Sequence, residues 1–301
     1  MAEIRDSQEL VQVTYEPFPS VSNSQELIQV TYEPFPSINN SQELIQIVWL
    51  EVPAYVPIIS GVDDGYTKAL LHFNGLDDSV IFTDETEKIW TPTANTKIDT
   101  DLFKFGSASG LFGGSGNYIS TPDHVDFDFG NDDFTVDFWL WVNSLANDTT
   151  LYNKRTDSSD MVHSKVELKK TTGVLSFSAQ SVGGSGWDIA NDTSFGTIMV
   201  GTWQHIAVAR TGTSIKLFFE GINNATVTTS AILSTSVATF KVGADSDTNS
   251  LNGRIAEFRV SKAKGRWSDN FTPPGRAYEP PTNASRMMKK FIRISGRRFV
   301  N

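Results

Sequence analysis

One polar stretch, ADSDTNSLNG, carries the best arrangement of metal-ligating side chains in the sequence. It places Asp245, Asp247 and Asn249 at alternate positions, and carboxylate and amide oxygens are the ligands that Ca²⁺ prefers in proteins. A loop of the EF-hand type would also need glycine at its sixth position and glutamate at its twelfth, where Ser250 and Ala256 stand. Two interpretations stay open: a calcium site formed by Asp245, Asp247 and Asn249, or a polar hairpin loop without a metal.

A second polar stretch, GGSGWDIAND, contains an aromatic ring among hydrogen-bonding side chains. The predicted glycan-binding residues are Trp187, Asp188, Asn191 and Asp192. The apolar C–H face of a sugar stacks on an aromatic ring, while its hydroxyl groups need donors and acceptors close by. The alternative is that Trp187 packs against the edge of a folded domain and contacts no ligand.

Patterns that indicate catalysis are missing from the sequence. Retaining glycoside hydrolysis needs two carboxylates about 5 Å apart on one face. Glu85 and Glu87 lie in a turn-like stretch, and the longest strand-like segment offers Asp137 alone. The sequence has no Gly-x-Ser-x-Gly elbow, Walker loop, His-Glu-x-x-His or dinucleotide fingerprint. We therefore predict that the protein is not an enzyme.

The composition of the sequence argues against some classes of binding partner. The formal charge of −10 opposes general nucleic-acid binding, because the phosphate backbone would be repelled. Six basic residues and no acidic one fall within 286–301, so a short basic tail follows an acidic body. The 301 residues include no cysteine, which excludes disulfides and thiolate metal sites.

The first residues, MAEIRDSQEL, are charged where a signal peptide needs an apolar run. No stretch of about eighteen apolar residues that could span a membrane as a helix occurs. We expect a chain that is made in the host cytoplasm and has no membrane span.

A 17-residue repeat occupies the N-terminal part. SQELVQVTYEPFPSVSN returns as SQELIQVTYEPFPSINN and, less conserved, as SQELIQIVWLEVPAYVP. In each copy apolar residues alternate with polar ones and prolines follow, which is typical of a half-buried strand. The alternating apolar residues of the three copies are Val11, Val13, Tyr15, Ile28, Val30, Tyr32, Ile45, Ile47 and Trp49.

Nine apolar side chains bury too little surface to order a segment of this length alone. We predict that the repeats form an attachment or oligomerisation arm, which adds strands to other copies of the protein or to another protein. A homo-oligomer is expected, with a trimer favoured. A disordered linker is the alternative.

The rest of the sequence consists of short alternating segments separated by Gly, Asn, Asp and Thr. In FTVDFWLWV, every second residue from Phe134 to Val142 is apolar, and these residues form one face. The other face has Thr135, Asp137 and two tryptophans. ARTGTSIKLFFEG predicts a hairpin with Thr211 and Gly212 at its turn. This pattern predicts an all-β fold, an antiparallel β-sandwich or jelly roll.

Several of these motifs, in this order, resemble the laminin-G-like, concanavalin A-like lectin/glucanase jelly roll of tailed-phage virion proteins. They are ALLHFNG, FKFGSASGLFGGSGNYISTPDHVDFDFGNDDFTVDFWLWV, TWQHIAVARTGTSIKLFFEG, FKVGAD and LNGRIAEFRVSKAKGRWSDNFTPP. The resemblance implies two antiparallel sheets with ligand loops at the rim, where relatives often carry calcium. It also implies structural roles for Trp203, His205 and Gly221. The Glu-x-Asp-x-(x)-Glu strand of the glucanases is missing from this sequence.

The predicted organisation has four parts. Residues 1–57 form the repeat arm, 58–65 a linker, 66–274 the sandwich, and 275–301 a proline-containing, basic C-terminal tail. Two interpretations of the tail stay open: a basic amphipathic element that docks on an acidic surface, or a disordered terminus.

The resemblance implies a non-enzymatic structural protein of a phage virion, as a head decoration, head fibre or tail-associated protein. Its expected partners are other copies of itself, other virion proteins and, weakly, glycans of the host surface. The expected location is the virion. The alternative is a dedicated glycan-binding adhesin or receptor-binding protein.

Overall fold

The computed structural model describes residues 65–156, 163–245 and 249–281. The three strand repeats of the predicted arm and the basic tail beyond residue 281 lie outside the described residues. In the described part, no helix is long and apolar enough to cross a membrane. The described helix is the short 3₁₀ segment η1, Val125–Phe127.

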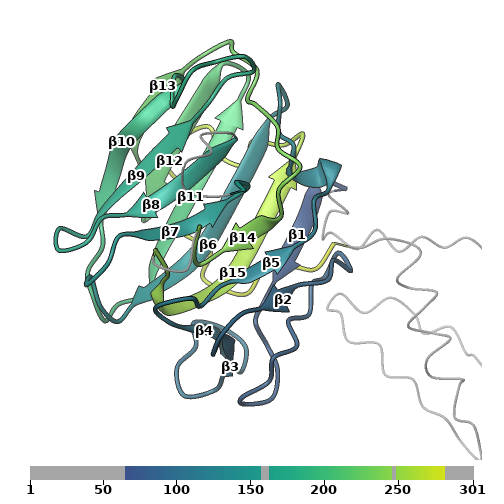
Figure 1. Ribbon diagram of the computed structural model, residues 1–301, viewed down its shortest axis with the longest axis vertical. Helices are drawn as coiled ribbons and strands as arrows, with labels where there is room; N and C mark the ends of the chain where they lie inside the picture. The colour runs from purple at the N-terminus through teal and green to yellow at the C-terminus, as the bar shows by residue number, and fades with distance from the viewer. Residues whose placement is uncertain (1–64, 157–162, 246–248, 282–301) are drawn as a thin grey trace, which may run out of the picture. The chain divides into compact units, whose positions relative to one another are not determined.

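Two antiparallel sheets form the described domain (Figure 1). Sheet A runs in the order β13 (Ile222–Thr228), β12 (Ser214–Phe219), β11 (Gln204–Thr211), β6 (Phe134–Val142), β15 (Asn252–Lys262), β4 (Ser109–Gly113) and β3 (Lys97–Asp99), with β1 (Thr67–Leu71) paired to β15 off this path. Sheet B runs in the order β10 (Ala190–Thr197), β9 (Val174–Ala179), β8 (Ser164–Leu168), β7 (Thr149–Asn153), β14 (Phe240–Val242), β5 (Ile119–Thr121) and β2 (Thr91–Pro92). The predicted β-sandwich is confirmed.

The core lies between the sheets and follows the predicted alternation. On β6, Phe134, Val136, Phe138 and Leu140 are fully buried. The inward residues of sheet B, such as Phe177 on β9, belong to the same hydrophobic cluster. Side chains of a strand point alternately to its two faces, so the residues between the inward ones point away from the core. Those outward rows carry the features described below.

Aromatic rings fill the middle of this core. Phe127 stacks on Phe240 with ring centroids 4.5 Å apart. The edge of Trp90 meets both of these rings and Phe258 at 6.3–6.4 Å, and its Nε1 donates to Asp84 Oδ2 at 2.8 Å. Such edge-to-face packing with a satisfied indole N–H is favourable in a protein interior.

The hairpin between β11 and β12 is confirmed, but its turn is one residue later than predicted. Thr211 pairs with Ser214, so the turn residues are Gly212 and Thr213. Gly212 has φ of +58°. This left-handed conformation suits glycine at the first turn position, whereas Thr211 remains extended in the strand.

A C-terminal segment, residues 263–281, packs on the outward side of sheet A, and we call it the strap. Thr135 Oγ1 donates to the carbonyl oxygen of Lys264 at 3.1 Å. Trp267 and Phe271 stack on each other at 4.0 Å and pack on a small outward cluster of β11 and β12 residues. Further along, the backbone N–H of Tyr278 donates to Glu257 Oε2 at 2.8 Å.

His163 precedes β8 in a fully buried position. Its Nε2 donates to the carbonyl oxygen of Phe127 at 2.6 Å, and its Nδ1 accepts from Ser164 Oγ at 3.2 Å. Burial lowers the pKa of His163 to about 4, although its bond to the carbonyl oxygen of Phe127 acts in the opposite direction. The imidazole is therefore neutral in the folded protein at neutral pH.

The stability of the domain is expected to fall between pH 7 and pH 5. In this range the unfolded chain protonates His163 and the folded chain does not, so the free energy of unfolding drops by about 2 kcal/mol. Urea unfolding at pH 7, 6 and 5 measures this change. His163→Asn lowers stability at every pH, but it should flatten the slope; an unchanged slope would contradict the assignment to His163.

Candidate functional site

Trp187 lies in the loop between β9 and β10, where its ring contacts two cations. The guanidinium carbon of Arg155 is 5.3 Å from the ring centroid, and Lys165 Nζ is 5.6 Å from it. Both distances fall within the range of cation–π attraction. The ring is half-buried, so it is fixed by its neighbours and still reaches the surface.

Polar side chains occupy the outward rows of β8 and β9 beside this ring, and those of Lys165, Glu167, Ser176 and Ser178 are at most 8% exposed. Lys165 pairs with Ser178 across the strands, and Glu167 pairs with Ser176. Directly opposite residues lie on the same face of a sheet. We call the set Lys165, Glu167, Lys169, Ser176, Ser178 and Asp192 the polar face.

A bulge in β10 places Asp192 at the margin of the polar face. The register shifts between Ala190 and Thr193, and Asp192 has φ of +48°. Its Oδ1 accepts from Lys169 Nζ at 3.0 Å and from Ser176 Oγ at 3.2 Å. Bulges commonly redirect a side chain in this way. Here Asp192 bonds to Ser176 on β9, and both Asn191 and Asp192 are exposed.

Charges of opposite sign alternate along the polar face. Lys165 Nζ lies 2.7 Å from Glu167 Oε1, and Lys169 Nζ lies 2.7 Å from Glu167 Oε2. Burial alone would raise the pKa of Asp192, but the hydrogen bond and charge of Lys169 outweigh it and lower the pKa. Asp192 therefore stays ionised near neutral pH and acts as a hydrogen-bond acceptor.

Asp188 holds the loop that carries Trp187. Its Oδ1 accepts from the backbone N–H of Ser181 at 2.7 Å, and its Oδ2 accepts from Ser181 Oγ. These hydrogen bonds from Ser181 lower the pKa of Asp188. Of the four predicted glycan-binding residues, Trp187 and Asp192 border the polar face, Asp188 fixes the loop and Asn191 is exposed in the bulge.

Asp245 connects the predicted metal residues to Trp187. Arg155 Nη1 donates to Asp245 Oδ2 at 3.2 Å, and both side chains are 2% exposed. Thus one guanidinium contacts both Asp245 and the Trp187 ring. Its positive charge opposes a cation at the carboxylate.

The backbone carbonyl of Asn249 accepts from Thr150 N at 3.2 Å. Asp247 lies outside the described residues, and the described residues contain no group of three or more His, Cys, Asp or Glu residues that could hold a metal. Calcium at Asp245, Asp247 and Asn249 stays a prediction.

Sequence reasoning missed most of the polar face. Lys165, Glu167, Lys169 and the two serines of the polar face, and Arg155 beside Trp187, were not among the predicted site residues. A signal was present, because KVELKK and VLSFSAQ carry polar residues at alternate positions. Sequence spacing alone does not show that these two strands are neighbours of the Trp187 loop.

A second polar cluster lies on the outward side of sheet A, beneath the strap. Asp137 accepts from Arg259 Nε at 3.0 Å and from Arg259 Nη2 at 2.9 Å. His205 is fully buried, and its Nε2 lies 3.0 Å from Tyr278 Oη and 3.7 Å from Asp137 Oδ2. Because Asp137 and His205 have no exposed surface, this cluster holds the strap and offers no contact to a substrate.

Comparisons with known proteins bear on the fold. A family model described as the concanavalin A-like lectin/glucanases superfamily matches residues 112–264. A search of curated proteins finds no match. Among solved structures, the chain is similar to the binding domain of Paraclostridial mosquitocidal protein 1, with 14% identity, 78% of this chain and 54% of that chain covered, and a TM-score of 0.51.

The chain is also similar to the binding domain of botulinum neurotoxin serotype D. That match has 13% identity, covers 66% of this chain and 49% of the other, and has a TM-score of 0.50. This chain thus spans about half the length of these two toxin-derived chains. At such low identities, the likeness shows a shared fold.

Proposed function

Because the chain belongs to the concanavalin A-like lectin/glucanases superfamily, we propose that its sandwich is a non-catalytic glycan-binding domain. The proposed contact surface consists of the polar-face residues that reach solvent, Lys169 and Asp192, together with Trp187; the buried residues of the polar face support them. A fold in this superfamily is compatible with several functions, so the proposal rests on the site.

The observation that carries the proposal is the fixed arrangement of donors and acceptors beside a tryptophan ring. Lys165, Glu167 and Lys169 hold one another in place through bonds of 2.7 Å. Lys165 and Glu167 are buried, so they hold the partly exposed Lys169 in place. Lys169 can then meet a sugar hydroxyl without first being ordered, which lowers the entropic cost of binding. Trp187 adds a ring on which the apolar face of a sugar packs.

The same geometry opposes glycoside hydrolysis. A glycosidase needs one carboxyl group that is protonated near neutral pH and donates its proton to the leaving group. On the polar face, Glu167 accepts from two lysine ammonium groups, and the pKa of Asp192 is lowered by Lys169 against the effect of burial. Both carboxylates therefore suit binding better than acid catalysis.

Replacing Trp187 by alanine is expected to weaken glycan binding about tenfold, which corresponds to about 1.4 kcal/mol. The measurement is a screen of the full-length chain against bacterial surface glycans, followed by calorimetry with the best ligand. Trp187→Phe keeps a ring and should retain most of the affinity. Trp141→Ala, at another half-buried tryptophan, is the matched control.

Two results would contradict the proposed site: no glycan binds, or Trp187→Ala binds as tightly as the unmodified chain. A micromolar affinity for one glycan alone would favour the alternative function, a dedicated adhesin or receptor-binding protein. Weak binding to several related glycans would favour a displayed domain that acts in many copies.

For the whole chain, we propose a structural role in a phage virion, with the repeat arm of residues 1–57 attaching the protein to other copies or to other virion proteins. The repeated alternation of apolar residues in the arm supports this proposal. Linking several weak glycan sites would raise the overall affinity for a host surface.

If residues 1–57 form an oligomerisation arm, the particle formed by the full-length chain and that formed by a chain without the arm should differ in mass. Light scattering is expected to show a defined oligomer, of trimer size, for the full-length chain and a monomer for a shorter chain beginning near Asp63. If both are monomers, self-assembly through the repeats is refuted.

A further inference from the structure

The connection between β1 and β2 exposes a group of apolar side chains at one edge of the sandwich. It includes Leu76, Val80, Ile81 and Ile89, each of them at least 59% exposed. Single apolar residues are common on protein surfaces, but a group of large aliphatic ones marks a surface that another segment covers. We call these four residues the aliphatic patch.

Two residues of the patch share one face of the backbone. Phe82 and Trp90 form an antiparallel bridge, and both side chains are buried. Ile81 and Ile89 precede them in the sequence, so their side chains point away from the core. Across an antiparallel pair, these two positions are diagonal neighbours on the same face, within reach of each other.

A turn adds the other two residues of the patch. The backbone N–H of Ser79 donates to the carbonyl oxygen of Leu76 at 3.1 Å, and Val80 follows this turn directly. The turn is tied to β3, because Asp78 N donates to the carbonyl oxygen of Ile98 at 3.0 Å and Ile98 N donates to that of Ser79 at 2.7 Å. The patch therefore rests on a fixed backbone.

Negative charge surrounds the aliphatic patch. Residues 76–89 include five acidic residues and one basic residue, a balance of −4. The basic one, Lys88, donates to Asp126, outside this segment, at 2.7 Å. Asp77 and Glu87 are exposed. Such a surface attracts a partner that is both apolar and basic.

The C-terminal tail has this composition. Residues 286–301 include six basic residues, no acidic one and seven large apolar ones. The apolar residues recur at intervals of four and three, as in Met287, Phe291 and Ile294. The basic residues lie between them at similar intervals. This pattern is typical of a segment with one apolar side and one basic side.

The described chain ends near the patch. The backbone N–H of Tyr278 in the strap donates to Glu257 Oε2 at 2.8 Å, and His72 Nδ1 lies 2.9 Å from the same oxygen. The residue before His72 pairs with Asp84, which lies between the residues of the patch. Seven residues separate Tyr278 from Arg286, and seven extended residues span about 23 Å. The tail can therefore reach the patch while the strap stays in place.

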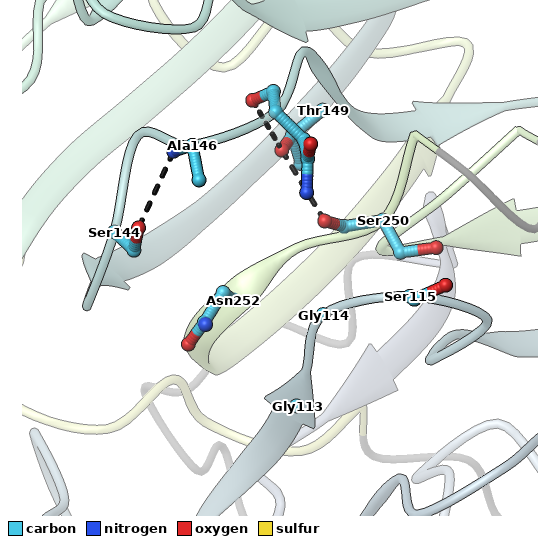
Figure 2. A pocket seen from close by; sticks show the side chains of 9 residues that line it. Gly113, Gly114, Ser115, Ser144, Ala146, Thr149, Ser250 and Asn252 are labelled. Carbon is cyan, nitrogen blue, oxygen red and sulfur yellow. Dashed lines mark hydrogen bonds between the residues drawn. The ribbon is translucent and has the colours of Figure 1, made fainter.

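Other surfaces suit the tail less well. Asp123 and Asp128 already contact the ammonium group of Lys154. A pocket of about 230 Å³ lies at the rim of the sandwich, where residues such as Ser144 and Asn252 line it (Figure 2). No lining residue of this pocket carries a charge, so it would not neutralise a basic segment.

We propose that the tail, residues 286–301, binds to the aliphatic patch of its own chain. The apolar side of the tail covers the four aliphatic side chains, and its basic side faces the carboxylates around them. The strap thereby continues around the edge of the sandwich. This inference does not rest on the proposed glycan site, because Trp187 lies beside β10, and β10 and β2 are at opposite ends of the strand order of sheet B.

The test uses disulfide formation in the full-length chain, which has no cysteine of its own. Two cysteines form a disulfide only where the backbone brings them close together. Ile81→Cys is combined with Ile292→Cys and, in a second variant, with Met288→Cys. After mild oxidation, at least one pair is expected to form a disulfide within one chain in most molecules. A denaturing gel without reductant and mass spectrometry of the linked peptides measure this yield.

A matched control separates docking from reach. Met199→Cys with Ile292→Cys introduces the first cysteine at a 63% exposed position that follows β10, far from β2 in the strand order. Its yield of disulfide within one chain should be lower by about fivefold or more, because opposite charges attract the tail to the patch and not to this position.

Charge reversal tests the electrostatic part of the proposal. Glu85→Lys and Glu87→Lys, added to the Ile81 and Ile292 cysteine pair, leave the length of the chain unchanged but repel the basic tail. The yield should fall by about fivefold or more. High salt should lower the yield of the original pair in the same direction.

Four outcomes would overturn the inference. Neither tail position forms a disulfide with position 81, the Met199 control gives an equal yield, charge reversal leaves the yield unchanged, or the disulfides link two chains. The last result would assign the patch to the tail of a second copy. Urea unfolding of each reduced variant shows whether it is folded, so that a low yield is not confused with loss of structure.

Discussion

Replacing Asp137 by alanine is expected to lower the free energy of unfolding by about 3–5 kcal/mol. Asp137 is fully buried and accepts two hydrogen bonds from Arg259, at 3.0 and 2.9 Å. Burial alone would raise the pKa of Asp137, but the charge of Arg259 and the contacts with Arg259 and His205 lower it well below the usual range. The substitution removes the buried carboxylate that accepts both of these hydrogen bonds from Arg259. Urea unfolding at pH 7 measures the loss.

A double substitution separates the lost ion pair from lost packing. Asp137→Leu combined with Arg259→Met removes both charges while keeping apolar volume, and should recover at least half of the loss. A single-variant loss of less than about 1 kcal/mol would contradict this account. So would a double variant that is as unstable as the single one.

Gly221→Ala is expected to lower the free energy of unfolding by about 2–5 kcal/mol. This loss combines the strain of a side chain on a left-handed backbone with the displacement of a neighbouring group. Gly221 has φ of +75°, a conformation in which a side chain is strained. An added Cβ would also overlap the carbonyl oxygen of Phe271 in the strap. The backbone N–H of Phe271 donates to the carbonyl oxygen of Gly221 at 2.9 Å, so the strap cannot move away without losing this bond. Thermal and urea unfolding measure the change.

Gly212→Ala is the matched control for this prediction. Gly212 has φ of +58°, and nothing lies within 4 Å of a Cβ added there. Gly212→Ala should therefore lower the free energy of unfolding by only about 1–2 kcal/mol, from the strain of a left-handed backbone. Equal losses for the two alanine variants would mean that the strap contact at Phe271 adds nothing to stability.

Much of the fold could be predicted because strands such as β6 alternate without interruption. β6 has nine residues, and its inward and outward rows are those expected from the sequence. β10 does not follow the alternation rule, because two bulges break its register against β9 and most of its residues are not buried. β4 gives no clear strand signal, because its short sequence, SGLFG, has two glycines, which are depleted in strands. Gly110 is required there, since a Cβ would meet the ring of Phe73.

The candidate site was only partly predictable, for a related reason. Trp187 could be recognised because it is the aromatic residue of the polar stretch GGSGWDIAND. Its partners Arg155 and Lys165 come from other strands, and their proximity depends on the order β10-β9-β8-β7 in sheet B. The order of the strands follows from how the two sheets pack. The alternation of apolar and polar residues within one strand does not indicate it.

The position of β15 has a consequence for how the chain acquires its structure. It is the last strand of the described chain, yet it lies in the middle of sheet A, with β6 on one side and β4 and β1 on the other. A ribosome delivers the chain from its N-terminus, so these partners are synthesised long before the strand that joins them. Pairings between distant residues, such as Leu71 with Phe258, also make folding slow.

The sandwich is therefore expected to close after synthesis and not during it. A product that stops before Asn252 lacks the centre of sheet A, and the edges of β6 and β1 that β15 would cover stay unpaired. Unpaired strand edges invite pairing between chains. Incomplete translation of this protein should accordingly yield aggregates, whereas loss of residues outside the sandwich should not.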